Sequence, residues 1–167
     1  MERRLAIKQV LILAGGMFVL PSCLKESGKS SIQLKNLDVD YTLENVLADI
    51  TEIIIPKTDT PGAIDLKLHL FVLKMVDDCY DKKDQKIFMN GLKYVSDLNK
   101  EEQNQFLIDA NAKKANLHED GYNFFNIVKE KTISGYLNSK YVMSNLVIWE
   151  LVPGRYNGFF PVKNAQA

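Results

Sequence analysis

Apolar residues recur at spacings of three and four along most of the chain after Tyr41, and this period constrains the fold more than any other feature. Between residues 42 and 55 the apolar positions with this spacing are Leu43, Val46, Leu47, Ile50 and Ile54. Such positions lie on one face of a helix, whereas a half-buried strand requires strict alternation. We find alternation of strand length only around residues 145–152. The sequence therefore predicts an all-α fold.

Four further segments complete a predicted small bundle of about five helices. They cover residues 64–80, 84–95, 100–115 and 121–136. The helix over 64–80 is apolar on most sides, which predicts the most deeply buried position. Asn99 and Glu102 have the spacing of a capping box at the start of the helix over 100–115. Gly135 is a candidate C-cap of the last helix.

The length and net charge of the chain limit the classes of protein to which it can belong. The chain has 167 residues, enough for one domain with its own core, and its 21 basic side chains equal its 21 acidic ones. A net charge of zero gives no indication of nucleic acid or of an acidic partner.

Residues 1–22 have the composition of an export signal. Arg3, Arg4 and Lys8 precede a stretch from Gln9 to Ser22 without charge. Its apolar run is about half of the roughly 20 residues that a transmembrane helix needs, so we interpret it as a cleaved signal. The adjacent arginines, with the lysine after them, resemble the twin-arginine export motif. A general secretory signal that happens to contain two arginines is the alternative.

Cys23 ends the sequence Leu20-Pro21-Ser22-Cys23, which resembles the lipobox of bacterial lipoproteins. We predict that Cys23 is lipidated, that residues 23–40 form a tether, and that residues 41–167 form a periplasmic, membrane-anchored domain. A plain signal-peptidase site is the alternative. Lipidation leaves Cys79 as the last thiol and excludes an intrachain disulfide. We expect Cys79 to be buried and inert.

The stretch IIIPKTDTPGA, Ile53 to Ala63, is unusually rich in turn residues. Pro56 must end the preceding helix. Thr60 to Ala63 predict a type II turn with positive φ at Gly62, and Asp59 is suited to an Asx turn. The sequence leaves open whether this corner is only a stiff connector or an exposed contact surface. The candidate contact residues are Thr58, Asp59, Thr60, Pro61 and Gly62.

The C-terminal tail carries aromatic residues in a stretch broken by glycines and prolines, so helical periodicity does not account for them. Either the tail packs on its own bundle, or it offers hot-spot residue types to a partner. We predict partner binding through Pro153, Gly154, Arg155, Tyr156, Phe159 and Phe160.

Motifs for chemistry are absent from the sequence. It has no glycine pattern for a dinucleotide or a phosphate and no paired-cysteine motif. His69 follows Asp65 by four residues and is able to pair with it or to join a metal site, but no third ligand is evident. A core or interface histidine is therefore favoured. His118 is predicted to be an exposed loop residue before a helix.

Four aspartates, Asp77, Asp78, Asp81 and Asp84, lie close together without the glycine-centred loop of a calcium site. We interpret them as a solvated helix end. The sequence thus predicts no catalytic, cofactor-binding or metal-binding residue in this chain.

Several stretches, taken together, resemble the gluconate 2-dehydrogenase subunit 3 family. They are IIIPKTDTPGA, VDDCY, FFNIVKEKTISGYLNS and VPGRYNGFFPV, and the resemblance covers roughly Tyr41 to Val162. It implies a noncatalytic small subunit of a membrane-bound sugar or alcohol dehydrogenase. In such complexes a large subunit of the glucose–methanol–choline type holds FAD, and a cytochrome subunit with haem c often takes the electrons onward.

The resemblance also implies a role in export, because the small subunit of this family commonly carries the twin-arginine signal that the large subunit lacks. A flavoprotein folds around FAD before export, and one signal then serves both chains. The corner would be a preformed contact surface. The alternative is a free-standing helical envelope lipoprotein that binds another partner or ligand.

Overall fold

The computed structural model describes residues 29–147 and 158–159. Its helices are α2 (Tyr41–Ile54), α3 (Leu68–Cys79), α4 (Lys82–Asp97), α5 (Lys100–Asn111), α6 (Glu119–Leu137) and a short π-helical turn, η1 (Val142–Leu146). The described residues contain no strand beyond an isolated bridge between Lys29 and Asp40. The predicted all-α fold is confirmed. None of the helices in this described part is long and apolar enough to cross a membrane.

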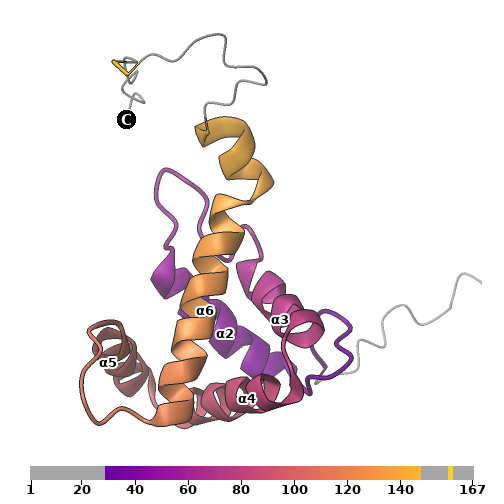
Figure 1. The fold of residues 1–167 in the computed structure, drawn as a ribbon, viewed down its shortest axis with the longest axis vertical. Coiled ribbons are helices and arrows are strands. Elements are labelled where there is room, and N and C mark those ends of the chain that lie inside the picture. The colour runs from indigo at the N-terminus through magenta and orange to yellow at the C-terminus, as the bar shows by residue number, and fades with distance from the viewer. Residues whose placement is uncertain (1–28, 148–157, 160–167) are drawn as a thin grey trace, which may run out of the picture.

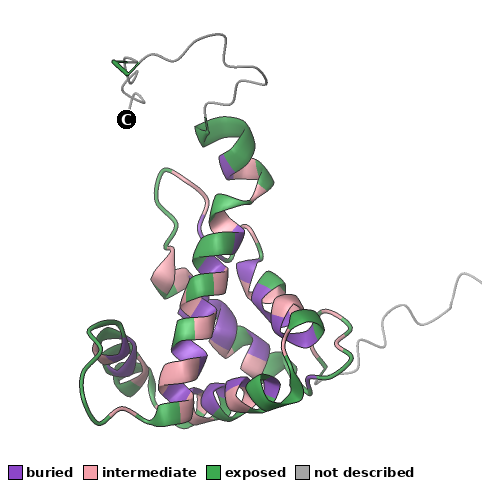
Figure 2. Cartoon of the chain, in the orientation of Figure 1, coloured by how far each residue is buried: buried purple, intermediate pink, exposed green. Residues whose placement is uncertain are grey.

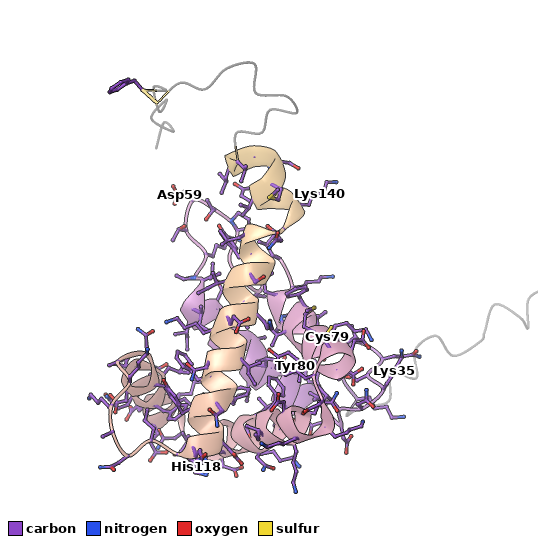
Figure 3. All side chains as sticks on the ribbon, viewed as in Figure 1. Lys35, Asp59, Cys79, Tyr80, His118 and Lys140 are labelled. Atoms are coloured by element: carbon purple, nitrogen blue, oxygen red, sulfur yellow. The ribbon has the colours of Figure 1, made fainter. Side chains whose placement is uncertain are left out.

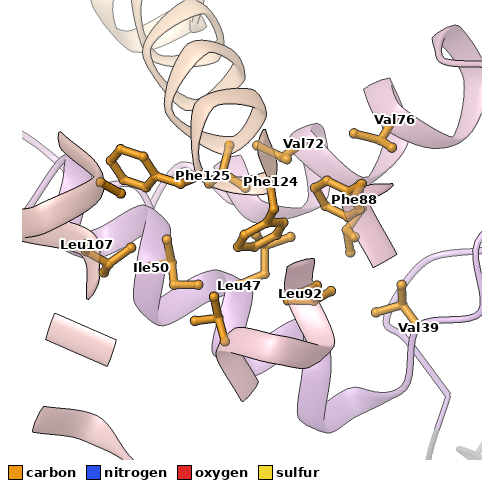
Figure 4. Close-up of a cluster of buried hydrophobic side chains, with 14 of the residues drawn as sticks. Val39, Leu47, Ile50, Val72, Val76, Phe88, Leu92, Leu107, Phe124 and Phe125 are labelled. Carbon is orange, nitrogen blue, oxygen red and sulfur yellow. The ribbon is translucent and has the colours of Figure 1, made fainter. Parts of the chain in front are cut away.

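The longest helix, α6, runs through the middle of the domain (Figure 1). α2 and α3 lie beside it, α4 crosses its lower end, and α5 lies at the edge of the bundle. Buried residues on these helices face a common centre (Figures 2 and 4). The largest fully buried side chains include Phe88, Phe124, Leu47, Ile50 and Leu73. The rings of Phe88 and Phe124 meet with their centroids 5.1 Å apart.

The predicted helix over 64–80 begins only at Leu68. Lys67 has a φ of 53°, in the left-handed region, which interrupts a helix that the apolar pattern alone would start earlier. The predicted cap at Gly135 is also wrong, because α6 continues to Leu137. Gly135 instead makes room for Phe71, whose Cδ1 would lie 2.7 Å from an added Cβ. The capping box of Asn99 and Glu102 is confirmed.

Residues 29–40, the described part of the predicted tether, pack on the bundle. Leu37 and Val39 are buried in the core. Asp77 of α3 accepts hydrogen bonds from the backbone amides of Lys35, Asn36 and Leu37 at 2.8, 2.7 and 3.0 Å. This segment is therefore fastened to α3 before the first helix begins.

The aspartate cluster and Cys79 differ from their predictions. Asp77 is buried rather than solvated, because it receives those backbone amides. Cys79 is exposed rather than buried, and it is the last residue of α3. Asp81 is the N-cap of α4 and accepts from the Asp84 amide at 2.8 Å.

Two glutamines join consecutive helices in the same way. Gln85, in the first turns of α4, donates from Nε2 to the carbonyls of Val76, Asp77 and Tyr80 at the end of α3. Gln103 of α5 donates to Val95 and Leu98 at the end of α4. Carbonyls at a helix C-terminus have no partner within the helix, so these side chains satisfy them and fix both tight connections.

Candidate functional site

The corner between α2 and α3 is closed at its stem by one carboxylate. Glu52 accepts the backbone amide of Lys57 at 2.9 Å and that of Ile64 at 2.8 Å. The amide of Ala63 donates to the carbonyl of Ile55 at 3.0 Å. The two ends of the corner are therefore held together beside the end of α2.

Gly62 does not form the predicted type II turn, since its φ lies outside the left-handed region. It is required for a different reason. An added Cβ would overlap Glu52 Oε1 and would lie 2.7 Å from the amide nitrogen of Lys57. The glycine thus lets the Glu52 carboxylate reach the stem, and this clamp, rather than a positive φ, sets the shape of the corner.

An ion pair braces the outer side of the same stem. Lys57 Nζ lies 3.0 Å from Asp65 Oδ2, and the hydrogen bond from Lys57 is the main cause that lowers the pKa of Asp65. Asp65 therefore pairs with Lys57 and not with His69, the other partner that the spacing allowed.

The tip of the corner projects from the bundle (Figure 3). Thr58 and Asp59 are exposed, Thr60 and Pro61 are half-buried, and Gly62 is buried. Within the described residues the Asp59 side chain makes no hydrogen bond, so the predicted Asx turn does not form. Thr60 Oγ1 accepts from the Tyr136 hydroxyl of α6 at 3.1 Å. Of the predicted contact residues here, Thr58 and Asp59 are the most accessible.

Substituting Gly62 by alanine is expected to destabilise the domain by about 2 kcal/mol, because the new methyl group displaces Glu52 from the stem. Amide hydrogen exchange should become faster at Lys57 and Ile64, the two amides that Glu52 accepts. Thr58→Ala, at the exposed tip, is the control and should leave both exchange rates and the melting temperature unchanged. If both amides still exchange slowly in Gly62→Ala, the proposed role of Gly62 in the Glu52 clamp would be contradicted.

An apolar groove of about 590 Å³ lies next to the corner. It is lined by Ile53, Ile54, Asn104, Leu107, Ile108, Asn111, Phe125, Lys129 and Ile133, from α2, α5 and α6. A second hollow shares Ile53 and Asn104 with it and adds Pro56 and Ile64 of the corner. The apolar pattern of the sequence did not indicate this groove, although three consecutive isoleucines at 53–55 cannot all lie on one buried helix face.

The interior histidine, His69, faces Glu44 of α2. Its Nε2 lies 4.0 Å from Glu44 Oε1, and its buried Nδ1 has no hydrogen-bond partner among the described residues. Burial is the main cause that lowers the pKa of His69, with Lys67 acting in the same direction and Glu44 against it. Glu44 also accepts the backbone amide of Ser31 at 2.5 Å. These contacts fit the interpretation of His69 as a core histidine.

His118 is exposed and precedes a helix, as predicted, and it also caps that helix. Its Nδ1 accepts the amide of Gly121 at 3.2 Å, and its ring stacks on Tyr94 with centroids 4.1 Å apart. Across residues 29–147 and 158–159, no group of three histidine, cysteine, aspartate or glutamate side chains is placed to hold a metal ion.

Other predicted site residues lie outside the described residues. These are Arg3, Arg4 and Cys23 at the N-terminus, and Pro153, Gly154, Arg155, Tyr156 and Phe160 in the tail. Phe159 is described, and its side chain is 95% exposed.

Comparison with known proteins identifies the bundle. Residues 43–154 match the family model described as gluconate 2-dehydrogenase subunit 3, a range that begins in α2 and extends past η1. No curated protein and no solved structure matches the chain. Because the match covers most of the chain and includes the corner, the protein belongs to the gluconate 2-dehydrogenase subunit 3 family.

Proposed function

We propose that this protein is the noncatalytic small subunit and export escort of an FAD-dependent dehydrogenase of the glucose–methanol–choline type, which oxidises gluconate or another sugar. The observation that carries the proposal is the family match over residues 43–154, because membership of this family implies a subunit of a gluconate 2-dehydrogenase complex. In this arrangement FAD is held by the large subunit, and haem c by a third, cytochrome subunit.

The contacts of the described residues support a binding role rather than a reactive one. The buried polar side chains Glu44, Asp77 and Gln85 hold backbone groups of neighbouring segments in place. The corner, by contrast, is a rigid loop with an exposed tip. Because it is already rigid, it would lose little conformational entropy when a partner binds. Its stem is fixed by Glu52 and its side by Tyr136.

The proposal places the complex in the periplasm, anchored through Cys23, with Arg3 and Arg4 directing export of both chains. We expect Arg3→Lys/Arg4→Lys to strand the flavoprotein in the cytoplasm, because lysine keeps the charge but lacks the planar guanidinium fork. The measurement is FAD content and sugar-dependent dye reduction in the periplasmic and membrane fractions, compared with the cytoplasm.

A reporter that uses the general secretory route, expressed in the same cells, is the control and should be exported normally. Normal export of the flavoprotein with the double variant would contradict the escort role. Purification of the wild-type chain from native membranes without any flavoprotein would contradict the subunit assignment itself.

A further inference from the structure

The groove between α2, α5 and α6 is an open apolar surface within an otherwise well-packed bundle. Ile53, Ile108 and Ile133 are 52%, 61% and 38% exposed, although all three line the same groove. Single exposed apolar side chains are ordinary, but several gathered around one hollow mark a binding surface.

Charge distinguishes this groove from a merely unfilled gap. Among the described residues that line it, Lys129 alone is charged. The Lys129 ammonium donates to the neutral amide oxygen of Asn111 at 2.6 Å, and among the described residues no carboxylate forms an ion pair with it. In the neighbouring hollow, Lys100 is paired with Asp49 at 3.1 Å. A ligand or partner that places a carboxylate next to Lys129 would therefore be complementary in charge to the groove.

The position of the groove points to the same partner as the corner. The two hollows share Ile53 and Asn104, and the second includes Pro56 and Ile64, so the apolar surface continues onto the stem of the corner. Figure 3 shows Asp59, at the tip of the corner, on one side of the domain and Lys35, in the segment that leads into α2, on the other. The groove and corner thus form one surface, away from the point where the chain enters the domain.

We propose that this groove receives an apolar segment of the flavin-holding dehydrogenase subunit, with an acidic side chain of that segment meeting Lys129. The inference rests on the proposed function and names the surface through which the two subunits dock. A polypeptide segment fits because the groove runs between helices and is open at exposed isoleucines, whereas small-molecule sites enclose most of their ligand. The isoleucines bind the apolar side chains, and Lys129 sets the register.

The test uses the full-length chain co-expressed with its dehydrogenase subunit and measures flavin recovered per tagged chain. Ile108→Glu and Lys129→Glu should each reduce recovery at least tenfold, because they place a negative charge in the groove. Lys129→Arg keeps the charge and should retain binding. Leu137→Glu is the matched control, since Leu137 is 55% exposed on α6 but does not line the groove, and its recovery should equal that of the wild type.

The outcomes separate this inference from the proposed function. Full recovery of flavoprotein with Ile108→Glu and Lys129→Glu would overturn the groove while leaving the subunit role intact. A wild-type chain that recovers no flavoprotein would overturn both. Circular dichroism and thermal melting of each variant show whether a loss of recovery reflects misfolding. If Ile108→Glu does not fold, Lys129→Glu, at a half-buried surface position, still tests whether the groove binds the dehydrogenase subunit. The inference would also be overturned if native mass spectrometry found a fatty acid bound to the wild-type chain while that chain was still in complex with the dehydrogenase subunit.

Discussion

Gly91→Ala is expected to destabilise the bundle by about 3 kcal/mol, which lowers the melting temperature by roughly 10 °C in a domain of this size. An added Cβ would overlap the Cβ of Phe124 and the backbone oxygen of Asp120, both on α6. Backbone atoms of a packed helix cannot move aside cheaply, so the two helices must separate. Their separation would also disturb the contact between Phe88 and Phe124.

Gly135→Ala is the matched control, because it makes the same substitution inside a helix. Its Cβ would meet the ring of Phe71, a side chain that is 37% exposed, rather than the backbone of another helix. Alanine is favoured over glycine in helices by about 1 kcal/mol, which offsets part of this smaller clash. Thermal denaturation followed by circular dichroism compares the two variants. Equal melting temperatures would show that the approach of α4 to α6 at Gly91 is not closely packed.

Asp77→Ala should cost about 3 kcal/mol, the second large effect. The substitution leaves the amides of Lys35, Asn36 and Leu37 without their carboxylate, and Leu37 is buried, so its amide cannot turn to water. Asp78→Ala is the control. Asp78 is exposed and forms a surface ion pair with Lys74 at 3.0 Å, and such pairs contribute about 0–1 kcal/mol. Urea denaturation measures both values.

The effect of Asp77→Ala should also depend on pH. Burial alone would raise the pKa of Asp77, but the hydrogen bonds from the backbone amides, with a smaller contribution from Lys74, outweigh it and lower the pKa. A carboxyl whose pKa is lowered by folding stabilises the fold above its unfolded-state pKa of about 4, and that contribution is lost as the pH falls through the folded-state pKa. The difference between wild type and variant should therefore be constant near neutral pH and shrink below about pH 4. A difference that stays the same at pH 3 would contradict this account.

The helices were predictable because their signals are local. Leu47 and Ile50 belong to a face with helical period, and both are buried. Asn99 and Glu102 form a capping box whose two hydrogen bonds connect residues three apart. A pattern that is complete within one turn of helix can be recognised without knowing what packs against it.

The errors concern residues whose partners lie far away in the sequence. Asp77 belongs to an acidic run, and nothing near it indicates that amides about 40 positions earlier will reach it. Gly62 stands after a proline, which favours a type II turn, but its conformation is set by Glu52 across the stem. Tertiary contacts override the local preference in both cases.

The candidate site was predictable in part for the same reason. The corner is a continuous stretch, so its rigid and exposed character was visible in its turn residues. The groove is assembled from α2, α5 and α6, and each contributes one exposed isoleucine that deviates from the main apolar face. Only the packing of the three helices brings those deviations together.

The contacts at Asp77 also determine how the domain resists mechanical force. A pull on the chain at Lys29 first loads the hydrogen bond from the Ser31 amide to Glu44, in the first turn of α2. It then reaches residues 35–37, whose amides donate to the carboxylate of Asp77. The amide bonds to that carboxylate are loaded together, and the buried side chains of Leu37 and Val39 must leave the core with them. Force applied from the N-terminal side is thereby borne by the start of α2 and the end of α3, whereas the corner and the groove lie at the opposite end of α2.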